Sequence, residues 1–208
     1  MNGQSATRTR LISEGMRQLL AHGYEGVGIG PILKEVDVPK GSFYYFFASK
    51  DDFVVAVIEA YEQKYAHIRE RLFSDTSLRA LQRLSVYFET LELELKQDGP
   101  YAGCLYGVIA QTSAGRSALV RDALAISFGR WETSIRELLT QAQYEDDIAG
   151  DEDVSDLCAC IIEAYEGALI RVKATGDIAA FTRFRIKGLQ RLMANMHHNG
   201  RVVSEDGR

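Results

Sequence analysis

The sequence has few of the residues that end helices or cross-link chains. It contains three prolines and three cysteines among 208 residues. Because proline removes a helical hydrogen bond, so few prolines leave long stretches free to form helices. Three cysteines are too few for the disulfide framework of a small secreted domain. No run of about eighteen apolar residues occurs, so we expect no membrane-spanning helix.

Other missing motifs argue against a secreted protein, a metal site and an enzyme. The N-terminus lacks a basic segment followed by an apolar one, so we expect no secretory signal and a cytoplasmic protein. Cys158 and Cys160 do not form a CxxC pair and have no histidine nearby, so we expect no metal and no cofactor. Nucleophile-elbow and phosphate-loop motifs are also missing. We therefore do not expect an enzyme.

The charge is unevenly distributed along the chain. Residues 1–50 carry six basic and four acidic residues, a net of +2, which leaves −7 for the rest of a chain whose total is −5. A basic N-terminal part on an acidic body suits a protein that meets phosphate at one end only. The hydrophobic share of 46% is enough for a large core, which argues against disorder.

Apolar residues recur at intervals of three and four, which predicts an all-α fold of about nine helices. We expect a three-helix head over residues 1–50 and a larger helical body over 51–208, joined through a helix that begins at Ser49. The expected helices cover residues 7–22, 31–36, 40–46, 50–73, 77–96, 103–112, 117–143, 154–174 and 177–196.

Three short signals predict where the helices of the head begin and end. Gly23 ends the first helix, because glycine accepts a left-handed backbone. Asp37 forms the turn between the second and third helices, since Asp tolerates a positive φ better than most residues. Ser49 caps the fourth helix, with Asp52 in the capping-box position.

The third predicted helix has an N-terminal end suited to the major groove of DNA. Such a helix needs small or polar residues near the bases. Lys40 can bind a phosphate, Gly41 lets the backbone approach closely, and Ser42 can donate to a base edge or a phosphate. On spacing alone, an aromatic-rich helical hairpin within a core is an equally good interpretation.

Aromatic residues continue this helix. Tyr44 and Tyr45 carry hydroxyl groups that can reach phosphates, while Phe43, Phe46 and Phe47 are expected to hold the helix in place. Lys50 lies at the start of the following helix, whose free N–H groups also favour an anion.

The head closely resembles the N-terminal signature of the TetR family of repressors over residues 7–53. The resemblance implies a homodimer that binds a pseudo-palindromic operator through two heads and releases it on binding a small effector. The residues that carry it are Gly23-Tyr24, Val27, Ile29, Ile32, Val36, Val38, Lys40-Gly41-Ser42-Phe43-Tyr44, Phe47 and Ser49-Lys50.

Two positions depart from this signature. Gly28 stands where many members carry a Thr or Ser that caps the second helix and touches phosphate. Gly30 replaces a residue that is often polar. We therefore expect this head to rely more on Arg8, Arg10 and the third helix.

Cys104 is the candidate sensor in the body. A thiol in the first turn of a helix has its thiolate favoured by the helix dipole, which predicts a reactive cysteine. The alternative is that Cys104 is a small buried hydrophobic residue. Cys158 and Cys160 are expected to pack in the ordinary way.

A second resemblance concerns residues 103–105 and 165–173. They are similar to the TetR branch that contains the N-ethylmaleimide reductase repressor and the acrylate-utilisation repressor. In the former, the matching cysteine senses electrophiles and oxidants, and a lysine at the position of Lys173 partners it. The resemblance implies that Cys104 is the sensor and Lys173 its neighbour, with Glu166 on the same helix face.

Aromatic residues of the body are candidate walls for an apolar effector pocket, although most aromatics at helical spacing simply form the core. The candidates are Tyr61, Tyr65, Phe88, Tyr106, Trp131 and Tyr165.

The last two helices are expected to form the dimer interface, because they offer more apolar surface than one small body would hide. Burial within the monomer is the alternative. The apolar residues concerned are Leu157, Ile161, Ala164, Ala168, Val172, Ile178, Phe181, Phe184, Ile186, Leu189, Leu192 and Met193.

Three competing functions remain open at this point. The same repressor fold could bind a noncovalent apolar ligand with no cysteine chemistry. An enzyme could use Cys104 as a nucleophile, although His22 and His67 fall in other predicted helices. An activator or a partner-binding protein on this fold is the third.

Overall fold

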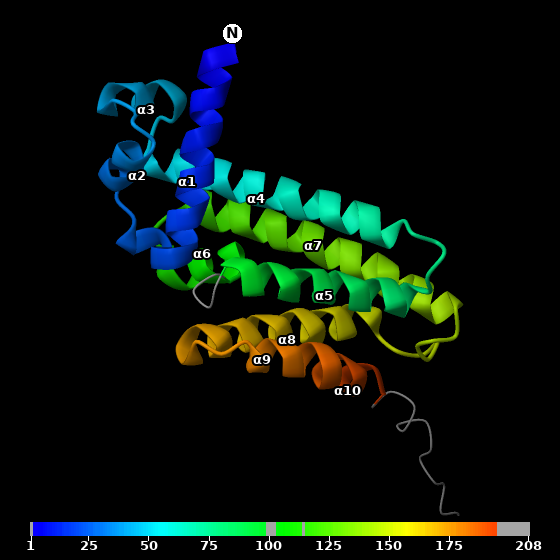
Figure 1. The fold of residues 1–208 in the computed structure, drawn as a ribbon. Helices are drawn as coiled ribbons and strands as arrows, with labels where there is room; N and C mark the ends of the chain where they lie inside the picture. Colours follow the sequence, from blue (N-terminus) through cyan, green and yellow to red (C-terminus); the bar gives the residue numbers. More distant parts are fainter. Residues whose placement is uncertain (1, 99–102, 114, 195–208) are drawn as a thin grey trace, which may run out of the picture.

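The structure, a computed structural model, describes residues 2–98, 103–113 and 115–194 (Figure 1). All regular elements in these ranges are helical, which confirms the predicted all-α fold. They are α1 (Asn2–Gly26), α2 (Ile29–Glu35), α3 (Lys40–Phe46), α4 (Lys50–Phe73), α5 (Ala80–Asp98), α6 (Leu105–Ser113), α7 (Ala118–Tyr144), α8 (Val154–Thr175), α9 (Ala179–Arg183), the π-helix η1 (Phe184–Gly188) and α10 (Leu189–Ala194).

The last three elements follow one another without a break, so the described part of the chain contains nine helical runs, as predicted. The third and fourth helices have their predicted bounds, and each of the other helices differs from prediction by a few residues at one or both ends. The last helix is not a single α-helix, because η1 interrupts it. The predicted break at residues 99–100 and the polar tail from His197 lie outside the described residues.

The head consists of α1, α2 and α3 and lies at one end of the body (Figure 1). Its centre is a cluster of three rings, Phe43, Phe47 and Phe53, with centroids 5.0–5.4 Å apart. Phe43 and Phe47 are buried, so they hold α3 in place as predicted. Asp37 takes the predicted positive φ, 50°, in the turn between α2 and α3.

In the body, α4, α5 and α7 run side by side, and α8 with the α9–α10 segment lies beneath them (Figure 1). Ser49 caps α4 as predicted, since its side chain accepts from the backbone N–H of Asp52 at 3.0 Å. A buried carboxylate, Glu92 of α5, accepts from Thr182 and Arg185 and thereby holds the last helical segment against α5. No described helix is long and apolar enough to cross a membrane.

The apolar surface of the last two helices is mostly used within one chain. Seven of the twelve residues expected at a dimer interface are buried in the monomer, which was the alternative interpretation of this surface: Leu157, Ile161, Ala168, Val172, Phe181, Phe184 and Leu189. Ile170 and Ile186 stay 50% and 45% exposed. A homodimer remains a prediction, and it rests on a smaller surface than expected.

The head and body meet where Gly23 ends the regular part of α1. Gly23 has φ 69° and ψ 179°, a backbone region essentially limited to glycine. A Cβ here would lie 2.5 Å from Cγ2 of Thr112 in α6. The backbone N–H of Tyr24 donates to Oγ1 of Thr112 at 2.8 Å, and Lys50 Nζ donates to the Tyr24 carbonyl at 2.6 Å. The Tyr24 hydroxyl also donates to Asp51, so this turn joins α1 to both α4 and α6.

We expect Gly23→Ala to lower the free energy of unfolding by about 2 kcal/mol or more, because the new side chain adds backbone strain and a clash with Thr112. Urea unfolding followed by circular dichroism measures this. Gly30→Ala is the matched control, since a Cβ at Gly30 meets nothing within 4 Å. The control should unfold at the wild-type urea concentration or above it. Equal stability of all three proteins would contradict the assignment of Gly23 as a required glycine.

Candidate DNA-binding face and effector cavity

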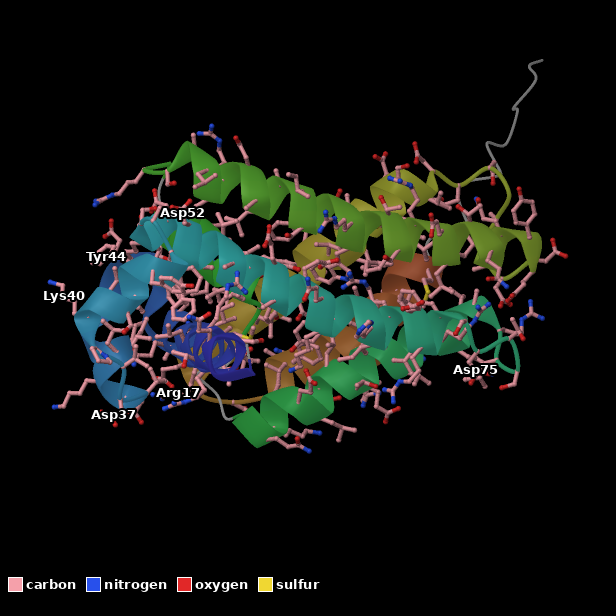
Figure 2. All side chains as sticks on the ribbon, turned by 90° about the horizontal axis from the view of Figure 1, so that it is seen from above. Arg17, Asp37, Lys40, Tyr44, Asp52 and Asp75 are labelled. Carbon is pink, nitrogen blue, oxygen red and sulfur yellow. The ribbon has the colours of Figure 1, made fainter. Side chains whose placement is uncertain are left out.

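The outer side of α3 presents polar and aromatic groups to solvent. Lys40 and Tyr44 point away from the body at the end of the molecule opposite Asp75 (Figure 2). Tyr44 and Tyr45 are 55% and 68% exposed, which is high for such large rings. A Cβ on Gly41 would meet nothing within 4 Å, so the backbone there is open to close approach. Ser42 is half-buried beside it.

The other predicted phosphate ligands already have partners within the head. The Arg8 guanidinium lies 5.4 Å from the centroid of the Phe47 ring, and Arg10 donates to the Val36 carbonyl in the turn before α3. Lys50 donates to the Tyr24 carbonyl and lies over the Tyr24 ring, and burial lowers its pKa. These three cations brace α1, α3 and α4. Their contact with DNA stays a prediction.

α2 begins two residues before the predicted start, at Ile29. Gly28 is its N-cap and makes no side-chain hydrogen bond. The free N–H groups at this end of α2 therefore have no side-chain oxygen from residue 28 to satisfy them.

A cavity of about 360 Å³ lies between α6 and α8. We call it the sensor cavity, and its walls come mainly from these two helices. They include Cys104, Glu166 and Lys173, which the sequence predicted at the effector site.

Cys104 directly precedes α6, and two opposing influences act on its thiol. The backbone N–H groups of Tyr106 and Gly107 lower its pKa, as a helix N-terminus should. Burial and the Glu166 carboxylate raise the pKa and outweigh them, so it lies well above the usual value. The expectation that the thiolate is favoured is therefore corrected: the thiol form is the stable one, because little water and an acidic neighbour surround it.

Glu166 reaches across from α8 to the first turn of α6. Burial raises the pKa of its carboxyl group to about 7, and Oε1 has no hydrogen-bond partner. Only glycine at position 107 permits this placement, because a Cβ there would lie 2.2 Å from Oε2 of Glu166. The carboxyl group is thus held close to Cys104 and half-ionised near neutral pH.

Lys173 lines the same cavity, but its ammonium group contacts the head. Nζ donates to the Leu20 carbonyl of α1 at 3.0 Å, and burial lowers its pKa. The contact that the structure contains is therefore with α1 rather than the predicted one with Cys104. Lys173 joins the wall of the sensor cavity to the head.

Three of the aromatic residues predicted at the effector site lie behind Cys104. Tyr106, Trp131 and Tyr165 are buried and surround a small chamber that Cys104 also lines. The Tyr106 hydroxyl donates to Glu62, and the Trp131 and Tyr165 ring centroids are 5.2 Å apart. Much of their surface is core packing, which was the alternative interpretation.

Sequence reasoning missed a buried ion pair on α4. Arg69 Nη2 donates to Oε1 of Glu62 at 2.6 Å, and both side chains are almost fully buried. The two residues are seven apart, so they share one face of the helix. The signal in the sequence was their spacing: Glu62 and Arg69 lie on the same helix face as the apolar residues Ile58 and Leu72. Among the residues described, no three metal-ligand side chains gather.

Two family models match the chain. The model described as "Bacterial regulatory proteins, tetR family" matches residues 11–57, and "Tetracyclin repressor-like, C-terminal domain" matches residues 80–187. Together they cover most of the head, the first part of α4 and most of the body.

Curated relatives and solved structures agree. The chain is 34% identical to "Transcriptional regulator AcuR" of Cereibacter sphaeroides over 81% of this chain and 77% of the relative. It is 33% identical to "HTH-type transcriptional repressor NemR" of Escherichia coli over 57% of this chain and 59% of that protein. A crystal structure of regulatory protein TetR from Rhodobacter sphaeroides superposes with a TM-score of 0.82 and 31% identity, over 90% of this chain and 97% of the other. The chain belongs to the TetR family of DNA-binding transcriptional regulators.

Proposed function

We propose that this protein is a cytoplasmic repressor that binds a pseudo-palindromic operator as a homodimer and is released by a small effector. The effector occupies the sensor cavity beside Cys104. The observation that carries this proposal is the bond from Lys173, a wall of that cavity, to the Leu20 carbonyl of α1.

The DNA-binding part rests on the exposed face of α3. A helix N-terminus with Lys40, Gly41 and Ser42 suits the major groove, and Tyr44 and Tyr45 flank it within reach of phosphates. Arg8, Arg10 and Lys50 keep the helices of the head in register, and their positive charge attracts the duplex.

Two contacts couple the sensor cavity to the head. Lys173 bonds to Leu20, and Thr112, another wall residue, accepts from the backbone N–H of Tyr24. An effector that displaces Lys173 or shifts α6 therefore changes how α1 is held. Because α1 packs on α2, such a shift alters the placement of the DNA-binding helices.

An electrophilic or unsaturated effector is the favoured class. With N-ethylmaleimide as the probe, the sulfur of Cys104 forms a bond to one alkene carbon, the alkene π bond breaks, and the thiol proton ends on the other carbon. Glu166 lies where it can take that proton in transit. The raised pKa of the thiol supports a noncovalent apolar ligand as the second candidate.

We expect Lys40→Ala to weaken binding to the DNA upstream of its own gene by at least about tenfold and to flatten its salt dependence, because a phosphate contact is lost from each head. Gel shifts at several salt concentrations measure both effects. Arg71→Ala, an exposed basic residue at the far end of α4, is the control and should bind like the wild type. If both variants bind DNA normally, α3 does not contact the operator through Lys40.

We expect N-ethylmaleimide to release the wild-type protein from its operator and to leave the Cys104→Ser variant bound. Mass spectrometry of the protein locates the adduct, and gel shifts report release. The Cys160→Ser variant is the control, since this exposed cysteine should react without affecting DNA binding. Release of Cys104→Ser by the reagent would overturn the assignment of the sensor.

We expect Glu166→Gln to stabilise the protein more at pH 8 than at pH 5. A carboxyl group whose folded pKa is raised stabilises below its unfolded pKa of about 4.5 and loses that contribution as the pH passes its folded pKa of about 7. The stability difference between variant and wild type should grow by up to about 3 kcal/mol across this window. Urea unfolding measures it, and exposed Glu163→Gln should show no such trend. A pH-independent difference would mean that Glu166 is not buried as described.

A further inference from the structure

Lys173 places a primary amine on the wall of the sensor cavity. It lies in the last turn of α8 and is half-buried. The walls around it are mainly apolar and include Val108, Leu169 and Ala174. Two of the wall residues, Gln111 and Ala174, are exposed, so a small molecule can enter the cavity from solvent. The amine is therefore within reach of a small apolar guest.

The ammonium group of Lys173 has a neutral partner and no described carboxylate beside it. Its Nζ donates to the backbone carbonyl of Leu20 in α1 at 3.0 Å. Burial lowers the pKa of the ammonium group, and no described carboxylate offsets this effect. Burial without a counter-ion favours the uncharged amine, which is the form that attacks carbonyl compounds.

The Leu20 carbonyl depends on Lys173 because α1 is interrupted just after it. In a continuous helix this carbonyl would accept from the backbone N–H of Tyr24, four residues further on. Gly23 interrupts the helix with φ 69° and ψ 179°, and the Tyr24 N–H donates instead to Thr112. Lys173 supplies the missing donor. Loss of that donor therefore weakens the joint between the head and the body.

We propose that Lys173 is a second covalent acceptor in the sensor cavity and forms an imine with small aliphatic aldehydes. The cavity of about 360 Å³ holds a chain of several carbons, and its apolar walls favour an aliphatic one. The inference rests on the proposed function, because it uses the same coupling of the cavity to α1. It does not require Cys104 to react.

Imine formation at Lys173 needs no oxidant or reductant. The ammonium group first gives a proton to water, and the amine nitrogen then forms a bond to the aldehyde carbon. The C=O π bond breaks, and its oxygen takes up a proton as the nitrogen loses one, which gives a carbinolamine. The C–O bond breaks next: the oxygen leaves as water with a proton from solvent, and the nitrogen lone pair forms the C=N bond. The nitrogen then returns its last proton to solvent, so the net products are a neutral imine, one water and one proton.

The imine removes the donor on which Leu20 depends. A neutral imine nitrogen carries no hydrogen, so the Leu20 carbonyl loses its partner on α8. Because α1 packs on α2, the loss changes how the DNA-binding helices are held. An aldehyde therefore weakens operator binding whether or not the thiol of Cys104 has reacted.

The test uses butanal, which has an aldehyde group and no alkene, so it cannot react with the thiol as N-ethylmaleimide does. Sodium cyanoborohydride reduces an imine to a stable secondary amine, and peptide mass spectrometry of the full-length protein locates it. We expect Lys173 to be labelled faster than Lys96, which is exposed and pairs with the Glu92 carboxylate at 3.2 Å. Without the reductant, butanal should weaken operator binding in gel shifts by about tenfold, and dilution should reverse the effect.

Lys173→Arg is the decisive variant, because a guanidinium group can still donate to the Leu20 carbonyl and does not form an imine. It should bind the operator like the wild type, which shows that it is folded, and it should lose the response to butanal. Lys173→Met removes the donor, so it should bind the operator about tenfold more weakly with no aldehyde present. Lys96→Arg is the matched control and should respond to butanal like the wild type.

The Cys104→Ser variant separates this inference from the proposed function. It should still be released by butanal, although N-ethylmaleimide no longer releases it. If it loses the response to butanal, the aldehyde acts through the thiol and the inference is wrong. The absence of a label on Lys173, a label without any change in operator affinity, or release of Lys173→Arg by butanal would also overturn it. Release of the wild type by N-ethylmaleimide is measured separately, so the proposed function stands or falls on its own.

Discussion

At Gly23 the chain adopts a conformation that side chains other than hydrogen do not tolerate, and Tyr24 is thereby placed among three helices. Its backbone N–H bonds to Thr112, its carbonyl accepts from Lys50, and its hydroxyl donates to Asp51. Tyr24 thus makes three hydrogen bonds that hold the head to α4 and α6. Since walls of the sensor cavity also contact this end of α1, the proposed coupling between the body and the DNA-binding helices runs through this joint.

The environment of Cys104 shows how local and tertiary effects compete. The start of α6 lowers the pKa of the thiol, whereas burial and Glu166 raise it, and the second pair prevails. The result is a cysteine whose thiol form is the stable one. A second group of buried polar side chains lies deeper in the body. Glu62 and Arg69 neutralise each other, so this buried pair adds no net charge to the core.

The fold and the head were predictable because their signals are local. Apolar spacing identified the helices, Asp37 and Ser49 marked a turn and a cap, and Phe43 and Phe47 are buried as expected, while Phe46 is half-buried. The site in the body was predictable only in part. Cys104, Glu166 and Lys173 do line one cavity, but the thiol environment and the partner of Lys173 differ from expectation. Glu62, Arg69 and Thr112 were missed, because their partners lie on other helices or a full two turns away.

The sequence by itself determined the helical class, the head with its groove-sized third helix, and the presence of one cysteine at a helix start. These features depend on residues within a few positions of one another. Only the tertiary structure decided which groups meet: Lys173 meets Leu20, and Glu166 meets Cys104 across Gly107. Such contacts depend on how α1, α6 and α8 cross, and no short-range pattern encodes the desolvation that sets the pKa of a buried thiol.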